Sequence, residues 1–443
     1  MQAGKGLKVI PFKKGPDYID AGWMSLAAGS PCYNLDLFLI PKERALESFT
    51  AHATGDMAII EGNRGLHDGM DAEGSCSTAE LAKLLSCPVI LILDCTKMTR
   101  TAAAVVLGCM GLDREVALRG VVLNQIAGIR HEAVIRASLE KYCGIPVLGA
   151  IPRLKTDELP ERHMGLTPYQ EHPDTIKVID TVRGIAEKYL DLDSIVSIAG
   201  EAGPLQSNSR QTAAPGYAAP GMRKTATVGV IRDSAFQFYY PENLEELEKR
   251  GAEIVDISAL EAEELPPLDA LYIGGGFPET NALRLAENEK FRHSVRSAVE
   301  AGLPLYAECG GLMFLGTAII AEGKRYPMVG VFPLVFEMRR KPQAHGYTIV
   351  EVVRTNPFYP VGTVLHGHEF HYSAVTDLPQ DITACTAFKM ERGHGLKDKA
   401  DGIWYKNAFA TYTHIHVFGA YEWADGFMKK AVEFRKGRRV LPA

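Results

Sequence analysis

The 443-residue sequence has no excess of positive charge, no long apolar run and no closely spaced cysteines, and each absence excludes a class of protein. Its formal net charge is −6, whereas a nucleic-acid-binding domain usually carries a basic excess. No stretch reaches the roughly 18 consecutive apolar residues of a membrane span, and the N-terminus lacks the apolar core of a signal peptide. The sequence therefore predicts a cytoplasmic protein with neither nucleic acid nor membrane as a partner.

The eight cysteines are scattered, without a CxxC pair or a short Cys/His ligand spacing. This spacing predicts reduced thiols rather than a disulfide framework or a zinc site. The chain is long enough for two domains with full cores, because single cores stop growing near roughly 250–300 residues.

Strand and helix patterns alternate in two regions of the chain. Short apolar runs such as "MAII", "PVILILDC" and "GVVLN" alternate with helical periodicity up to about residue 195, which is typical of parallel βαβ units. Residues 196–224 are rich in Gly, Ala, Ser and Pro and are predicted to be a linker. A second alternating region, 225–443, predicts another α/β domain. The opening stretch "GLKVIPFKKGPDYID" predicts a buried strand that has no strand before it.

The segment "LPLYAECGGLMFLG" places Cys309 where an apolar strand turns into a helix. At such a turn the side chain stands above the sheet edge, and the positive end of the helix dipole lowers the pKa of a thiol. Gly310 and Gly311 allow a sharp turn and leave backbone N–H groups beside the sulfur. The segment predicts a nucleophile with an oxyanion hole; a buried structural cysteine is the alternative.

Two further segments favour the nucleophile. "YIGGGFPET" is a second strand that ends in glycines, where a neighbouring loop can supply another oxyanion donor. Near the C-terminus, "ATYTHIHVFGAY" places His414 and His416 at strand spacing, so that one of them can act as the base for Cys309.

In this order the segments resemble a class I glutamine amidotransferase domain, in which a Cys–His pair hydrolyses glutamine to release ammonia. The resemblance implies a nucleophile, a base and three oxyanion-hole glycines: Cys309, His414, Gly275, Gly276 and Gly310. Typical members carry an acid two residues after the histidine. Here that position is His416, so the sequence does not identify the group that orients His414.

Segments from about residue 8 to about residue 425 resemble the cobyrinate a,c-diamide synthases in the same order, among them "FKKGPDYID", "IIEGNRGLHDG", "IPRLKTDELPERHMGL" and "GHEFHYS". The resemblance implies an α/β chain of two domains. Residues 1–195 would form a parallel sheet like that of P-loop NTPases and dethiobiotin synthetase, and 225–443 the amidotransferase domain.

The family implies a glutamine-hydrolysing carbon–nitrogen ligase. Mg-ATP phosphorylates the a and c acetate carboxylates of a tetrapyrrole polycarboxylate, and ammonia from glutamine displaces the phosphate. ATP and Mg²⁺ are therefore the expected cofactors, and glutamine and the tetrapyrrole the expected partners. A homo-oligomer is compatible with the sequence, in which no feature fixes the oligomeric state.

Polar residues of the first domain fit these tasks. Glu61 directly follows the strand "MAII", at the sheet edge where α/β proteins bind ligands, and suits Mg²⁺. The candidates for substrate binding are Asp17, Tyr18, Asp20 and Asp68, and those for nucleotide binding are Lys13 and Asn124. The alternatives are solvated turns for the acids and a surface position for the lysine.

Two segments depart from the cobyrinate enzymes toward more basic and polar residues. Asn63, Arg64 and His67 lie in "GNRGLHDGMD", and two basic residues lie in "DCTKMTRTAAA". These variants look more like the branch that amidates sirohaem or sirohydrochlorin, which the sequence slightly favours over cobyrinate. Which tetrapyrrole is the substrate stays open.

The phosphate-binding motif G-x-x-x-x-G-K-[ST] occurs nowhere in the chain. The first strand and the P-loop of the expected sheet are thus predicted to be missing. One interpretation is an N-terminally incomplete form of an ATP-dependent amidase, which we favour. The alternative is a natural variant that only binds a tetrapyrrole or hydrolyses glutamine.

Overall fold

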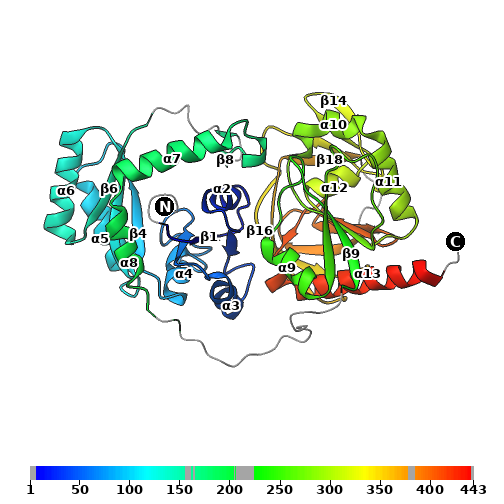
Figure 1. Cartoon of the computed structure of the whole chain (residues 1–443), viewed down its shortest axis with the longest axis horizontal. Coiled ribbons are helices and arrows are strands. Elements are labelled where there is room, and N and C mark those ends of the chain that lie inside the picture. The colour runs from blue at the N-terminus through cyan, green and yellow to red at the C-terminus, as the bar shows by residue number, and fades with distance from the viewer. Residues whose placement is uncertain are drawn as a thin grey trace. The chain divides into compact units, whose positions relative to one another are not determined.

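The computed structural model describes residues 6–154, 161–162, 165–203, 205, 224–377 and 385–440. The chain forms two compact α/β units, which agrees with the predicted fold class (Figure 1). Unit 1 comprises Met1–Leu37 and Lys42–Gln211, and unit 2 comprises Phe38–Pro41 and Thr212–Ala443. Most of the predicted linker, 206–223, lies outside the described residues, and a helix continues past its expected start to Ala199.

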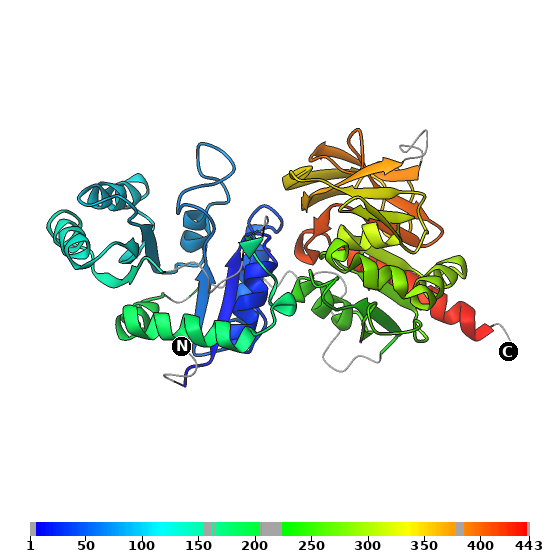
Figure 2. The same ribbon diagram turned by 90° about the horizontal axis from the view of Figure 1, so that it is seen from above.

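Unit 1 contains two three-stranded parallel sheets, ordered β2-β1-β3 and β4-β5-β6, and a small hairpin. The strands are β1 (Val9–Lys14), β2 (Tyr33–Leu35), β3 (Met57–Glu61), β4 (Val89–Asp94), β5 (Leu118–Ile126), β6 (Val147–Pro152), β7 (Glu161–Arg162) and β8 (Gly165–Leu166). The helices are α2 (Ile19–Ala28), α3 (Lys42–His52), α4 (Thr78–Leu84), α5 (Thr101–Leu112), α6 (Ile129–Cys143), α7 (Thr175–Tyr189) and α8 (Leu192–Ala199). Helices α5 and α6 pack side by side against the second sheet (Figure 2).

The expected parallel sheet of unit 1 is therefore in two pieces. Strands β3 and β4 are edge strands, and among the described residues they pair neither with each other nor with a strand between them. Apolar side chains of β4 are consequently only partly covered, and Ile92 is 68% exposed. A continuous α/β sheet would bury such a run on both faces.

Unit 2 is built on a ten-stranded sheet ordered β10-β9-β11-β12-β21-β20-β19-β16-β17-β22, with a four-stranded sheet β14-β13-β15-β18 beside it. Its first strands are β9 (Ala226–Ile231), β10 (Ala252–Ile257), β11 (Ala270–Ile273), β12 (Leu305–Glu308), β13 (Ala318–Ala321), β14 (Lys324–Pro327) and β15 (Val335–Met338). The remaining strands are β16 (Ala344–Val352), β17 (Val364–His371), β18 (Ser373–Asp377), β19 (Thr386–Arg392), β20 (Ala400–Tyr405), β21 (Ala408–Thr411) and β22 (His414–Ile415).

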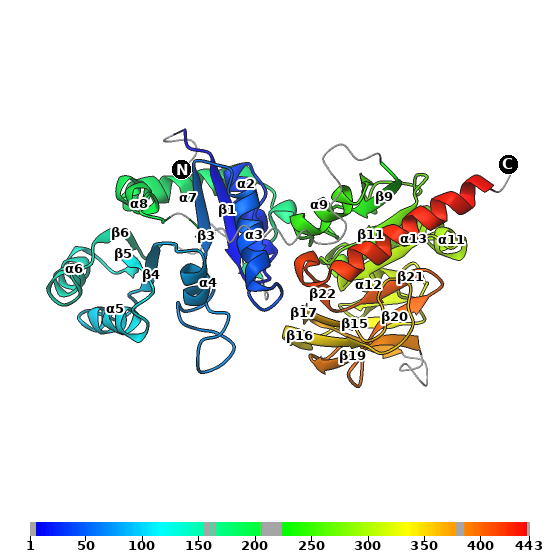
Figure 3. The same cartoon turned by 90° about the horizontal axis from the view of Figure 1, so that it is seen from below.

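Helices cover both faces of the parallel part of this sheet. Side chains alternate along each strand, so apolar residues lie on both faces and each face packs against helices. Tyr272 and Tyr306 face helix α13, whose Trp423 lies 5.3 Å from each ring. The intervening apolar residues belong to the core that contains α11 and α12. The helices are α9 (Pro241–Lys249), α10 (Ala282–Glu287), α11 (Glu289–Glu300), α12 (Gly310–Leu315) and α13 (Tyr421–Val440). Figure 3 shows α13 along β9 and β11.

Unit 2 also includes the short segment Phe38–Pro41. The Phe38 ring stacks on Tyr347 and His366 at centroid distances of 4.3 and 4.7 Å. Its carbonyl accepts a hydrogen bond from Nδ1 of His366 (3.0 Å). A piece of the N-terminal half of the sequence is therefore part of the C-terminal core.

A helix that crosses a membrane has to be long and apolar, and the helices of the described residues do not meet this requirement.

Candidate active sites

Cys309 lies between β12 and α12, at the strand-to-helix turn expected from the sequence. Its backbone is strained, with φ 45° and ψ −96°, a combination that non-glycine residues seldom adopt. Such strain costs about 1–3 kcal/mol and persists where the surroundings hold it. Here the Cys309 N–H donates to the Thr411 carbonyl (2.8 Å) in the neighbouring strand. A strained turn of this type presents the nucleophile in other hydrolases.

The prediction that the helix lowers the pKa of Cys309 was wrong. Burial raises the pKa of the thiol, and the charges of Glu279, Glu308 and Glu369 raise it further. The hydrogen bond from the Gly310 N–H lowers the pKa of Cys309, but this effect is smaller than the effect of burial. Cys309 is only 7% exposed, and α12, whose positive end would favour the thiolate, is only six residues long. The thiol is therefore the resting form, and a base must remove its proton before it can attack.

His414 has a buried acid as its partner. Nδ1 of His414 lies 3.0 Å from Oε2 of Glu308, and the two side chains are 3% and 1% exposed. Burial raises the pKa of Glu308, and the contact with His414 opposes this shift. An acid on Nδ1 fixes the tautomer that leaves Nε2 as the base, as in Ser-His-Asp sites. Glu308 is thus the orienting group that the sequence did not identify.

His416 belongs to a separate buried pair. Its Nε2 lies 3.5 Å from Oε1 of Glu242, and both side chains are fully buried. The His368 ring stacks on His414 at a centroid distance of 4.9 Å, and the two residues are paired in the β17–β22 ladder. Burial lowers the pKa of His368 well below its usual range, and His414 adds to the shift. His414 therefore contacts both the Glu308 carboxylate and a neutral imidazole.

The predicted oxyanion-hole glycines lie against these groups. A Cβ at Gly275 would lie 2.5 Å from Cε1 of His414, and one at Gly310 would lie 3.0 Å from the backbone nitrogen of Gly276. Gly310 is the first residue of α12, so its N–H has no acceptor within the helix. The structure thus brings the three glycines, Cys309 and His414 together around one turn.

We expect Gly275→Ala to cut glutamine hydrolysis about 100-fold, because the new methyl group displaces the His414 ring by a fraction of an ångström or more. Overpacking should also lower stability by about 1–3 kcal/mol. Glutamate release and urea unfolding measure the two effects. Gly437→Ala, on an open face of α13, is the matched control and should change neither. Full activity of Gly275→Ala would contradict this geometry.

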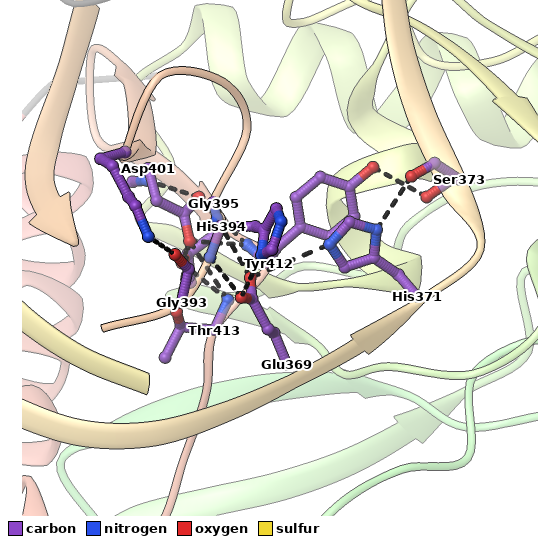
Figure 4. Close-up of polar contacts among 12 residues, drawn as sticks. Glu369, His371, Ser373, Gly393, His394, Gly395, Asp401, Tyr412 and Thr413 are labelled. Carbon is purple, nitrogen blue, oxygen red and sulfur yellow. Dashed lines mark hydrogen bonds and ion pairs between the residues drawn. The ribbon is translucent and has the colours of Figure 1, made fainter. Parts of the chain in front are cut away.

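A buried carboxylate holds the backbone that leads to His414 (Figure 4). Asp401 accepts hydrogen bonds from the Thr411 hydroxyl (2.7 Å), the Tyr412 N–H (3.2 Å) and the Thr413 N–H (3.3 Å). All three donors immediately precede His414 in the sequence. Asp401 therefore fixes the approach of this segment to Cys309, whose own N–H is bound by the Thr411 carbonyl.

In unit 1, Lys13 lies at the centre of a second polar cluster. Its ammonium is 2.9 Å from Oδ2 of Asp20 and 3.0 Å from Oε2 of Glu61, and the side chain is 4% exposed. Burial alone would lower the pKa of Lys13, but the two carboxylates outweigh it and raise the pKa. Lys13 is therefore a buried, permanently charged group and not a surface lysine.

Asp17 joins this cluster through the turn that begins α2. Its Oδ1 accepts the Asp20 N–H (2.7 Å), and its carbonyl accepts the Asn34 side-chain amide (2.9 Å). Burial, followed by the charge of Asp20, raises the pKa of Asp17 from 3.8 to about 6. Asn34, which the sequence did not single out, ties β2 to this turn.

The raised pKa of Asp17 predicts a pH-dependent loss of stability. The folded chain holds this proton more tightly than the unfolded chain, so stability falls as the pH rises from 3.8 to about 6, and the loss is complete above that range. Asp17→Asn should therefore be more stable than the wild type by about 3 kcal/mol at neutral pH, and equally stable below pH 3.8. Urea unfolding across this range measures the difference. A constant difference at all pH values would contradict the shift.

The remaining predicted residues of unit 1 are Tyr18, Asp68 and Asn124. Tyr18 directly precedes α2, and Asp68 accepts the Gly65 N–H (3.0 Å) within its own loop. Asn124 ends the apolar part of β5, in the second sheet, and accepts the N–H of Gln125. Among the described residues no group of three or more His, Cys, Asp or Glu side chains could hold a metal ion. Glu61 as a metal ligand and Asn124 as a nucleotide contact stay predictions.

Two family profiles match the chain. One describes a CobB/CobQ-like glutamine amidotransferase domain and matches residues 227–421; the other describes an AAA domain and matches residues 39–158. Similar curated proteins match almost the whole chain. One is the protein named cobyrinate a,c-diamide synthase from Magnetococcus marinus, which is 44% identical over 95% of this chain and 90% of that protein. Another protein of that name, from Archaeoglobus fulgidus, is 40% identical over 97% of this chain and 92% of that protein. The protein of that name from Methanothermobacter thermautotrophicus is 40% identical over 98% and 95%.

Proposed function

The chain belongs to the cobyrinate a,c-diamide synthase family, and we propose that it amidates the a and c acetate carboxylates of a cobyrinate-type tetrapyrrole with ammonia from glutamine. Members are glutamine-hydrolysing amidotransferase ligases, and so is this chain. The observation that carries the proposal is the near full-length likeness to these enzymes, to which the Cys309, His414 and Glu308 arrangement adds a physical basis.

In unit 2, His414 takes the proton of the buried Cys309 thiol, and the sulfur attacks the side-chain amide carbon of glutamine. The N–H groups of Gly276 and Gly310 stabilise the oxyanion, and Glu308 stabilises the imidazolium. The proton then passes from His414 to the leaving ammonia. Water, activated by the same histidine, releases glutamate from the thioester.

In unit 1, the cluster around Lys13 is the proposed amidation site. ATP supplies the phosphoryl group that turns a carboxylate oxygen into a leaving group. Lys13 offers a positive charge to a phosphorylated carboxylate, and Asp17, which titrates near pH 6, can accept a proton from the attacking ammonia. Ammonia has to reach the carboxylate without entering bulk water, since it is mostly protonated there at neutral pH and the ammonium ion is not a nucleophile.

The residues present do not by themselves make a complete Mg-ATP site. The chain has no G-x-x-x-x-G-K-[ST] loop, Glu61 is paired with Lys13, and no metal-ligating group is gathered among the described residues. Nucleotide use is supported by the AAA-domain match and by the family.

The substrate preference rests on the relatives rather than on the basic departures. All eight of the similar curated proteins compared, 36–44% identical to this chain, bear the name cobyrinate a,c-diamide synthase. Of the departures that favour sirohaem, His67 donates from Nε2 to the Cys109 carbonyl (3.0 Å) and so joins its loop to α5. Arg64 is exposed and stays available to a ligand.

The test is a product assay with amide-¹⁵N glutamine and ATP, in parallel with cobyrinate, sirohaem and sirohydrochlorin. We expect mass spectrometry to find two labelled amides in cobyrinate. Labelled sirohaem or sirohydrochlorin without labelled cobyrinate would overturn the substrate and keep the reaction. Glutamate release without any amide would favour the alternative, a chain that only hydrolyses glutamine.

A further inference from the structure

Lys14, at the carboxyl end of β1, is a buried lysine without an ion pair. It is 5% exposed, yet none of the ion pairs among the described residues includes it. Its neighbour Lys13 is equally buried but makes two ion pairs. Since side chains alternate along a strand, the two lysines leave β1 on opposite sides. Burying an unpaired ammonium costs free energy, so packing alone does not explain Lys14.

The loop that carries Asn63 and Arg64 covers this end of β1. A Cβ at Gly15 would lie 3.0 Å from Nδ2 of Asn63 and 3.9 Å from Oδ2 of Asp36. Arg64 is exposed, and it too makes no ion pair among the described residues. Its φ of 56° lies in the left-handed region, which non-glycine residues seldom adopt. Two unpaired cations therefore lie within one short stretch of the sheet edge.

The charges around Lys14 leave it short of an anion. Burial lowers the pKa of Lys14, the charges of Asp36 and Cys76 oppose this shift, and those of Arg64 and Lys13 add to it. Asp36 is itself 1% exposed and is the one carboxylate that bears strongly on this ammonium. A bound oxyanion would give both cations a partner. Charge-assisted hydrogen bonds of this kind are roughly twice as strong as neutral ones.

We propose that Lys14 and Arg64 bind a peripheral carboxylate of the tetrapyrrole that is not itself amidated. The inference rests on the proposed function and adds the contact that selects the orientation of the substrate. A tetrapyrrole is wide enough to reach two points of a sheet edge, so a carboxylate held here decides which acetate group meets the cluster around Lys13. The same two cations also suit a phosphate group, and the experiment separates these two sources.

The experiment is an absorbance titration of the full chain with cobyrinate, without ATP or glutamine. We expect Lys14→Met and Arg64→Asn each to weaken binding by about tenfold or more, since each removes a hydrogen bond to a charged group. Asparagine is chosen at residue 64 because it tolerates the positive φ. Lys14→Arg should restore most of the affinity. Lys141→Met, on the exposed face of α6, should bind like the wild type.

Stability distinguishes this role from a structural one. Lys14→Met removes an unpaired buried charge, so its unfolding temperature should equal or exceed that of the wild type. A loss of binding that merely follows a lower unfolding temperature would overturn the proposal. So would wild-type affinity of both variants, in which case the amidation function still stands.

Two further arms complete the test. A cobyrinate whose carboxylates are all esterified should bind the wild type and Lys14→Met equally weakly. Inorganic phosphate or ATP should weaken cobyrinate binding to the same extent in the wild type and in Lys14→Met. If either weakens cobyrinate binding to the wild type but not to Lys14→Met, the site binds phosphate and the proposal of a carboxylate site is overturned. No binding of any tetrapyrrole to the wild type would refute the proposed function and this inference with it.

Discussion

Cys309→Ala is expected to abolish glutamine-dependent amidation, with a loss of at least about 1,000-fold, while amidation with added ammonium salt persists. The sulfur forms the bond to the glutamine carbon, and no other described side chain at this turn can replace it. Ammonia bypasses unit 2 chemically, because it enters the reaction after glutamine has been hydrolysed. The measurements are glutamate release and amide formation, each with glutamine and with ammonium chloride.

The control for this variant is Cys95→Ala, which removes another buried thiol, in unit 1, and should leave both activities near the wild-type level. The ammonia-dependent rate should rise with pH in the wild type and in Cys309→Ala alike, since only free ammonia is a nucleophile. Equal loss of both activities in Cys309→Ala would refute a role confined to glutamine hydrolysis.

Local patterns in the sequence were sufficient to predict the elements that carry the chemistry. The apolar run before Cys309 and the glycines after it determine a strand, a turn and a helix within eleven residues, Leu305–Leu315. The alternation of apolar runs with helical periodicity likewise predicted both α/β units. Such features depend on neighbours in the chain, which a single sequence displays directly.

The orienting acid could not be predicted in this way. Glu308 was visible as the last residue of a strand, but its partner His414 lies 106 residues further along the chain. Only the pairing of β12 with β21, and the turn from β21 into β22, brings them to 3.0 Å. The sign of the Cys309 pKa shift failed for a related reason. The positive end of a helix is a local feature, whereas burial and the carboxylates of Glu279 and Glu369, which come from other segments, are not.

Lys13 shows the same limit in unit 1. The sequence suggested separate roles for Lys13, Asp20 and Glu61, but the register of β1 against β3 places Lys13 directly opposite Glu61. Lys13 makes ion pairs with both Asp20 and Glu61, so the three residues form one cluster. The sequence motifs had suggested a phosphate contact, a substrate contact and a metal ligand instead. Sheet register joins residues that sequence spacing keeps apart.

Glu308→Gln is expected to lower glutamine hydrolysis by about 10²–10⁴-fold with little change in the KM for glutamine. The amide keeps the volume of the acid but carries no charge, so it no longer stabilises an imidazolium on His414 or holds the tautomer with a free Nε2. Because burial raises the pKa of Glu308, neutralising it removes a costly buried charge. The unfolding temperature of Glu308→Gln should therefore be no lower than that of the wild type.

The matched control is Glu242→Gln, which neutralises another fully buried glutamate beside a histidine, at His416. It should change glutamine hydrolysis by less than about tenfold, because Glu242 pairs with His416, whereas the acid on His414 is Glu308. A Glu308→Gln variant that keeps more than a tenth of wild-type activity would show that His414 needs no acid. A large loss in Glu242→Gln and none in Glu308→Gln would instead make His416 the base of this site.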